Sequence, residues 1–205
     1  PWTPSLFEDF QKTFGSDLTD YLPELFLWKD GERVHPIKWQ YMELLQRKFQ
    51  EVFLTGCRDW CHDHHLKLTG HLLHEDTLTA QAAMLGSLMR AYEYMDEPGV
   101  DVLGRNNRIY WIVKQLASAA RQLGKPKILS EMYADSGWGY RFENFKALGD
   151  WQALFGINQR CHHLSWYSMK GSAKRDYPAS VSGQSAWYPY FDKVEGNFAR
   201  LHVFM

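Results

Sequence analysis

From residue 67 onward the chain alternates short apolar segments with amphipathic ones, and this alternation restricts its fold more than any other feature. The short segments begin near residues 67, 100, 127 and 157, so successive starts lie 33, 27 and 30 residues apart. A strand, a crossover helix and the step to the next strand take about 30 residues or more. Regular alternation at this spacing predicts a parallel sheet with helices packed outside it.

The elements themselves follow from hydrophobic periodicity, which separates helices from strands. The predicted strands span residues 67–73, 99–104, 127–131 and 157–167, and the predicted helices span 36–61, 79–95, 107–123, 142–155 and 188–203. Gly124 and Gly156 directly follow two of these helices. Glycine is the preferred residue just beyond a helix C-terminus, so both positions support the predicted helix ends.

Two architectures fit this pattern, a doubly wound sheet and a (β/α)8 barrel. No glycine-rich phosphate motif follows a predicted strand, which disfavours nucleotide binding. A complete barrel needs about 250 residues, whereas this chain has 205. We therefore predict an α/β protein whose residues 1–205 form part of a (β/α)8 TIM barrel. The fragment would be the C-terminal half, about strands five to eight with their outer helices.

Composition limits the classes of partner. The net charge is −1, so no broad electrostatic attraction to nucleic acid is expected. No apolar run approaches the roughly 18 residues of a membrane helix, so no membrane insertion is expected either. Aromatic residues reach 16% and there are nine histidines. This content suits either a sugar-binding cleft or a thick aromatic core.

In a barrel, functional residues gather at the carboxyl ends of the strands. The polar and aromatic residues that follow or end the predicted strands are His71, His74, Glu75, Asp101, Glu131, Trp138, His163 and Tyr167. Buried parallel strands are normally apolar, so polar groups there must be satisfied by a ligand or by neighbouring strands. Of these, we expect Glu131, His71, His163 and Tyr167 to converge on one face of the sheet.

Glu131 is the main catalytic candidate. It follows the apolar pair Ile128 and Leu129 and precedes a loop that contains Trp138. A carboxylate at a strand end beside an aromatic residue is the arrangement that glycosidases use for a nucleophile or general base. The alternative is a structural role, in which Glu131 caps the next helix or pairs with Arg141.

Metal binding is not expected at the cysteines. The chain has three cysteines, an odd and low number that argues against a disulfide framework. Cys57 and Cys61 lie four residues apart on the apolar face of the predicted long helix, together with Phe53 and Trp60. Zinc sites use a different spacing. His71 and His74, near Glu75, could ligate a metal, but we interpret them as contacts to sugar hydroxyls.

The order of short motifs between residues 114 and 201 resembles the second half of the catalytic barrel in glycoside hydrolase family 106, the α-L-rhamnosidase-like enzymes. The motifs are Leu129-Ser130-Glu131, Gly137-Trp138-Gly139, Asp150-Trp151-Gln152, Gly156-Ile157-Asn158, His163-Leu164-Ser165 and Lys174-Arg175-Asp176-Tyr177-Pro178. Upstream, Gly70-His71 and Pro98-Gly99-Val100-Asp101 also fit. The resemblance covers most of the chain.

This resemblance implies an exo-acting glycosidase that removes a terminal sugar such as α-L-rhamnose from plant or microbial polysaccharide. The family uses two catalytic carboxyl groups, one of which is the general acid. The resemblance assigns the other one to Glu131, which would be the general base if the enzyme inverts. It places the acid before Pro1 and the accessory β-sandwich domains outside the chain. We therefore expect a fragment that is inactive and prone to associate by itself. The resemblance also allows a calcium ion in the sugar site, and a periplasmic or secreted location.

Two alternatives remain open at this point. The first is a retaining, β-galactosidase-like barrel in which Glu131 is the nucleophile. The second is a barrel that binds carbohydrate without catalysis. The distance between the two carboxyl groups would separate the enzymatic cases, since about 5–5.5 Å indicates retention and about 6.5–9.5 Å indicates inversion.

Overall fold

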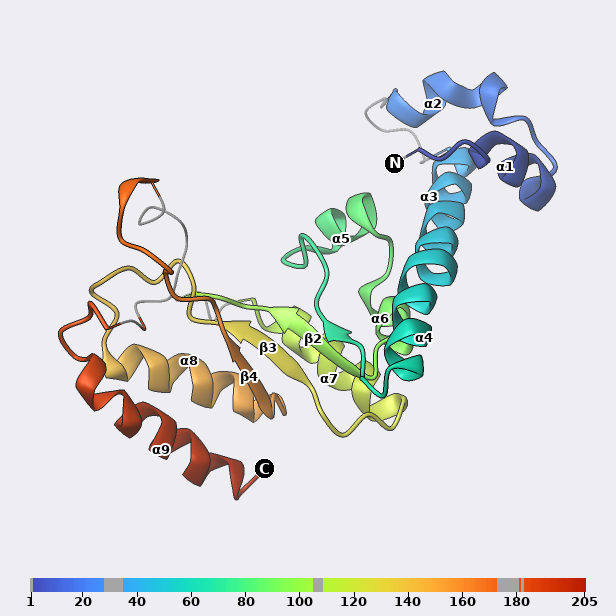
Figure 1. The fold of residues 1–205 in the computed structure, drawn as a ribbon. Helices are drawn as coiled ribbons and strands as arrows, with labels where there is room; N and C mark the ends of the chain where they lie inside the picture. Colours follow the sequence, from blue (N-terminus) through green and yellow to red (C-terminus); the bar gives the residue numbers. More distant parts are fainter. Residues whose placement is uncertain (1, 28–34, 105–108, 173–180, 182) are drawn as a thin grey trace.

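The computed structural model describes residues 2–27, 35–104, 109–172, 181 and 183–205 (Figure 1). The first residues of the predicted helix 107–123 and the motif Lys174-Arg175-Asp176-Tyr177-Pro178 lie outside these ranges. So does Pro1, the first residue of the chain.

The centre of the fold is a small sheet of four parallel strands. The strands are β1 (Thr69–Gly70), β2 (Glu97–Asp101), β3 (Leu129–Met132) and β4 (Gln159–His162). They lie side by side in the order β1-β2-β3-β4, and every neighbouring pair is parallel. The α/β alternation and the parallel pairing are therefore present as the sequence predicts.

The predicted (β/α)8 barrel fragment is wrong. The described residues form an open sheet of four short strands, with β1 at one edge and β4 at the other, and no barrel is shown. The strands also run in sequential order, without the reversal that defines a doubly wound sheet. A spacing of about 30 residues is common to every parallel α/β sheet, so it carries no information on closure.

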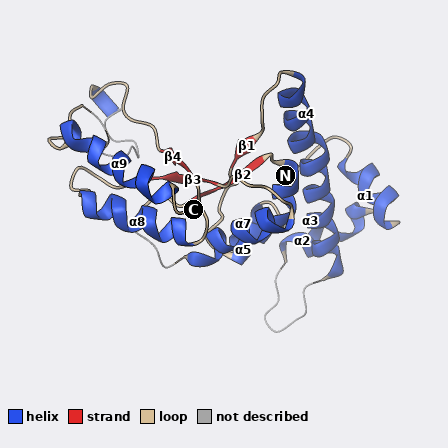
Figure 2. Ribbon diagram, turned by 90° about the horizontal axis from the view of Figure 1, so that it is seen from below, coloured by secondary structure: helices blue, strands red, loops and turns tan. Residues whose placement is uncertain are grey.

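Three helices pack on one side of the sheet. They are α7 (Tyr110–Gln122), α8 (Phe142–Leu154) and α9 (Phe191–His202), the last preceded by the short 3-10 helix η5 (Tyr188–Tyr190). Figure 2 shows α7 and α8 on the same side of the strands. Right-handed crossovers between sequential parallel strands have this effect. Apolar side chains of α7 pack with β2, and those of α8 and α9 pack with β3.

Side chains alternate between the two faces of the sheet, so register decides which residues share a face. Val100 and Met132 are buried in the two clusters beneath the sheet. Asp101 and Glu131, one position away from them, therefore point to the opposite face. The register pairs Asp101 with Glu131 and Glu131 with Cys161. These three residues thus line the face that α7, α8 and α9 leave open.

The N-terminal helices form a separate layer. The elements are α1 (Leu6–Phe14), η1 (Leu18–Tyr21), α2 (Leu22–Phe26), α3 (Pro36–Lys48), the π-helical turn η2 (Phe49–Leu54) and α4 (Thr55–Asp63). From Pro36 to Asp63 the backbone is helical without a break, which confirms the predicted helix 36–61. Helices α1 and α3 share their own apolar cluster, and Figure 1 shows α1 and α2 projecting away from the sheet.

Two predicted elements are shorter or broken. The predicted helix 79–95 divides into α5 (Leu78–Met84), α6 (Leu88–Ala91) and the 3-10 helix η3 (Tyr92–Tyr94). Gly86 lies in the gap with φ +84°, a left-handed conformation that stops a helix. The predicted strands 67–73 and 157–167 contract to β1 and β4. A hydrophobic run does not determine where a strand begins or ends. The ends depend on hydrogen bonds to a neighbouring strand, which lies far away in the sequence.

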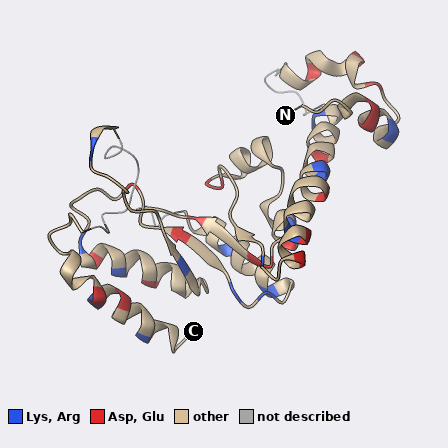
Figure 3. Cartoon of the chain, in the orientation of Figure 1, with Lys and Arg blue, Asp and Glu red and all other residues tan. Residues whose placement is uncertain are grey.

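Charged residues of both signs are interspersed along the helices (Figure 3). No helix in the described ranges is both long enough and apolar enough to cross a membrane. The expectation that nucleic acid is not a partner stays a prediction.

Candidate functional site

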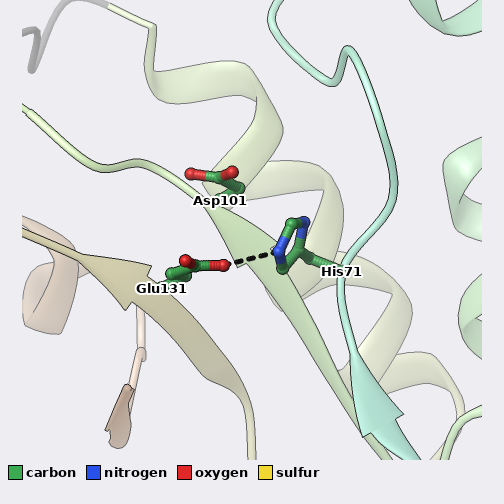
Figure 4. Close-up of side chains that lie close together, drawn as sticks. All are labelled: His71, Asp101 and Glu131. Atoms are coloured by element: carbon green, nitrogen blue, oxygen red, sulfur yellow. Dashed lines mark hydrogen bonds and ion pairs between the residues drawn. The ribbon is translucent and has the colours of Figure 1, made fainter. Parts of the chain in front are cut away.

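Three side chains meet at the carboxyl ends of β1, β2 and β3 (Figure 4). His71 Nε2 lies 2.6 Å from Glu131 Oε2. Asp101 completes the group, since one nitrogen or oxygen of each residue lies within 4.8 Å of the others. On the other side, His163 Nε2 lies 3.8 Å from Glu131 Oε1, longer than a hydrogen bond. Glu131 is thus flanked by groups from the three other strand ends.

The backbone explains why these four residues meet. Asp101 is the last residue of β2, and Glu131 is its register partner on β3. His71 directly follows β1, and His163 directly follows β4, where its N–H donates to the Met132 carbonyl at 2.9 Å. Because the strands are parallel, their carboxyl ends share one edge of the sheet. Side-chain alternation then turns all four toward the open face.

Both ring nitrogens of His71 face acceptors. Nδ1 lies 3.1 Å from the Leu72 carbonyl oxygen, and Nε2 faces the Glu131 carboxylate. A ring that donates from both nitrogens is the protonated form. Burial opposes that charge, but the Leu72 carbonyl and the negative charges of Glu75, Asp101 and Glu131 outweigh it and raise the pKa of His71.

Asp101 is half-buried between the two flanking histidines. Burial raises its pKa, and the charge of Glu131 acts in the same direction, while His71 and His163 oppose the shift. Asp101 therefore holds its proton to a higher pH than an ordinary aspartate does.

Glu75 is a buried residue of the site and is only 4% exposed. One carboxylate oxygen accepts the Leu72 N–H at 2.9 Å, and the other accepts the Asp101 N–H at 2.8 Å. Both oxygens are therefore engaged by the backbone of the site.

The remaining predicted residues lie nearer the surface. His74 is exposed and has a left-handed φ of +55°. Tyr167 is fully exposed. Trp138 stacks on Trp166, with ring centroids 4.6 Å apart and planes inclined by 20°. Trp166 is absent from the predicted residues, although its place after the fourth strand, beside Tyr167, is the signal that could have identified it.

The polar character of β4 has a structural cause. Arg160 and His162 point toward α9, where each lies 3.2 Å from a carboxylate oxygen of Glu195. The Arg160 guanidinium also lies over the Phe198 ring, 3.6 Å from its centroid. Two of the polar residues in this strand therefore have an ion-pair partner within the protein, on the face opposite to Glu131.

The donor set does not suit the calcium ion that the resemblance allows. Calcium prefers about 6–8 oxygen ligands. The group of His71, Asp101 and Glu131 offers two carboxylates and one imidazole, and the imidazole already donates to Glu131. Imidazole nitrogen is a ligand for softer metals such as zinc or copper. The residues present therefore do not fit calcium.

Cys57 and Cys61 are expected to bind no zinc. Both lie on α4, where they are partly buried and free of disulfides. Phe53 and Trp60, which the predicted apolar face assigned to the core, are each 57% exposed. Metal analysis of the purified protein should show only background zinc, unchanged by Cys61→Ser. Stoichiometric zinc that disappears in this variant would contradict the prediction.

The site should make the protein less stable as pH rises from 5 to 8. Burial raises the pKa of Glu75 from 4.5 to about 7, although the Asp101 and Leu72 amides oppose the shift. In this window the folded state keeps a proton that the unfolded chain has released, so stability falls with increasing pH. The raised pKa of His71 acts with the same sign. We expect a loss of about 2–3 kcal/mol from Glu75.

Denaturant unfolding at several pH values measures this effect. Glu75→Gln should reduce the change between pH 5 and 8, because the amide does not titrate. Glu97→Gln is the matched control on β2. Burial opposes the shift, but Lys67 and Lys127 lower the pKa of Glu97, so its contribution changes only below its ordinary value of 4.5. Equal slopes for wild type and Glu75→Gln would contradict the prediction.

No family model, no curated protein and no solved structure matches this chain. The resemblance to the α-L-rhamnosidase-like enzymes thus stays a prediction. The functional proposal rests on the residues and the geometry of the site.

Proposed function

We propose that this chain carries a catalytic carboxylate of a glycoside hydrolase. The substrate class is a terminal sugar, such as α-L-rhamnose, in plant or microbial polysaccharide. One observation carries the proposal: Glu131 lies on the open face of the sheet, surrounded by hydrogen-bonding side chains from the three other strand ends. The motif order that resembles family 106 supports the choice of sugar.

Glu131 acts on the anomeric carbon in one of two ways. As a general base it takes a proton from a water molecule that attacks this carbon, which inverts its configuration. As a nucleophile it attacks the carbon itself, and water later releases the sugar with retention. In either case His71 holds Oε2 by a hydrogen bond, and Oε1 is the oxygen left for the reaction.

The neighbouring residues supply the groups that a sugar ring requires. A sugar hydroxyl both donates and accepts, so Asp101 can accept from it while His163 donates or accepts according to its tautomer. Trp138, stacked on Trp166, presents an aromatic surface on the loop that follows β3. Such a surface suits the apolar face of a sugar or an aryl leaving group.

A retaining mechanism is the second candidate, with both carboxylates supplied by this chain. Asp101 and Glu131 are register partners on neighbouring strands, and a carboxylate oxygen of each lies within 4.8 Å of the other. The raised pKa of Asp101 suits a proton donor to the leaving group. In this case Asp101 is the acid and Glu131 the nucleophile.

The test uses the full-length gene product with aryl α-L-rhamnosides and aryl galactosides. Release of the aryl group is expected with one of these substrates, and NMR of the first-formed anomer separates inversion from retention. Binding of the sugar without turnover would instead indicate a carbohydrate-binding protein. Neither binding nor turnover over a panel of terminal sugars would overturn the proposal.

A further inference from the structure

Glu75 joins two segments that carry residues of the site. Its carboxylate bridges the N–H of Leu72, which follows His71, and the N–H of Asp101 at the end of β2. The distances are 2.9 Å and 2.8 Å, and the residue is 4% exposed. A single buried carboxylate thus holds the backbone beside His71 and the backbone of Asp101.

The carboxylate replaces a missing stretch of strand. The register of β1 with β2 covers only Thr69 with Glu97 and Gly70 with Pro98. The Val102 N–H donates to Glu131 on β3, so the preceding amide, that of Asp101, faces the β1 side. Strand β1 ends at Gly70, before it reaches this amide, and Glu75 supplies the acceptor at 2.8 Å. A side chain, that of Glu75, therefore continues the hydrogen bonding of β2 at the point where β1 has ended.

The bridge is itself fixed by two helices. Gln81 of α5 donates from Nε2 to the Glu75 carbonyl at 2.7 Å. The same amide group lies 3.0 Å from the side-chain oxygen of Gln115 on α7. Because Gln81 is buried, these contacts restrict the backbone from which the carboxylate extends. Side chains of α5 and α7 thus support the backbone of Glu75.

We propose that Glu75 is a positioning residue for Glu131: in its charged form it sets the backbones of His71 and Asp101 so that both side chains meet Glu131. This inference rests on the proposed function of Glu131. It assigns Glu75 no contact with substrate.

Charge matters because only the carboxylate offers an acceptor to both amides. A protonated carboxyl group, or the amide of Gln, keeps one good acceptor and presents a donor to the second N–H. Loss of the charge therefore releases either Leu72 or Asp101. The titratable groups that face Glu75 are His71, Asp101 and Tyr92 of η3. Helices α5 and α7 present the uncharged Gln81 and Gln115.

The position of this change on the pH scale supports the inference. Burial raises the pKa of Glu75 to about 7, with Asp101 adding to the shift and His71 opposing it. The site should thus become ordered and active as pH rises through the neutral range.

The experiment compares four forms of the full-length protein: wild type, Glu75→Gln, Glu75→Asp and Glu97→Gln. For wild type and Glu97→Gln we expect kcat to rise between pH 6 and 8. Glu75→Gln should have a kcat about 10–100-fold lower at pH 8 and no rise over this range. Glu75→Asp keeps the negative charge on a shorter side chain. In this variant kcat should again rise between pH 6 and 8, but to a lower maximum than in wild type. A rising profile in Glu75→Gln with wild-type kcat would overturn the inference.

A second readout does not depend on glycosidase activity. NMR of the histidine rings should show a slowly exchanging, downfield Nε2 proton of His71 in wild type and in Glu97→Gln, because this proton is bonded to Glu131. The signal should be lost in Glu75→Gln and, as an assignment control, in Glu131→Ala, which removes the acceptor. Its persistence in Glu75→Gln would overturn the inference. If no form shows turnover, the proposed function fails. If the His71 Nε2 signal is nevertheless lost only in Glu75→Gln and in the Glu131 variant, the positioning role of Glu75 stands. If Glu75→Gln does not fold, Glu75→Asp provides the test. A changed His71 Nε2 signal or a lower maximum of kcat in this variant supports the inference, and a wild-type signal with a wild-type pH profile would overturn it.

Discussion

Glu131→Gln in the full-length protein is expected to lower kcat for aryl glycosides by about 10²–10⁴-fold. The amide keeps the shape of the side chain but can neither accept a proton as a general base nor attack as a nucleophile. The Gln carbonyl oxygen can still accept the hydrogen bond from His71 Nε2, so the local geometry should persist. KM should change much less than kcat, since the lost interaction belongs to the transition state.

The control is Glu97→Gln, which makes the same chemical change at the opposite end of the strands. Glu97 begins β2 and pairs with Lys67 at 3.1 Å, remote from the carboxyl edge. Its variant should keep wild-type turnover. Thermal unfolding shows whether both variants are folded. If Glu131→Gln retains near-wild-type kcat with an unchanged melting temperature, Glu131 is structural and the proposed function is wrong.

Gly149→Ala should destabilise the fold by about 1–3 kcal/mol, which corresponds to a fall in melting temperature of several degrees. Gly149 lies on the buried face of α8 where α9 crosses closely. A methyl group there would overlap the Phe198 ring and lie 2.8 Å from the Tyr133 hydroxyl oxygen. Both rings belong to the buried cluster under β3, so neither can move without opening a gap.

Gly56→Ala provides the matched control. Gly56 lies in α4, and a methyl group added there meets no atom within 4 Å. Alanine favours the helix by up to about 1 kcal/mol over glycine, so this variant should be as stable as wild type or more stable. Thermal unfolding of the two variants separates helix propensity from packing. A Gly149→Ala variant with an equal or higher melting temperature would contradict the close α8–α9 contact.

Local pattern predicted the order of elements and the long helix 36–61 because each rests on the spacing of neighbouring residues. The rule that parallel strands end at one edge singled out Glu131, His71, Asp101 and His163 before any contact was known. The same reasoning assigned Glu75 to the substrate. Burial of its carboxylate against two backbone amides is a non-local event, and a sequence carries no local sign of it.

By itself, the sequence determined an α/β alternation with polar residues at the strand ends, since periodicity and turn residues act over a few positions. The tertiary structure decided three further points. The sheet is open, with four strands in sequential order, because strand pairing at the edges depends on partners far along the chain. The face that carries Glu131 follows from register, and a shift of one residue would reverse it. Finally, Glu75 closes the ladder beside Asp101, because β1 ends after two residues and leaves that amide without a strand partner.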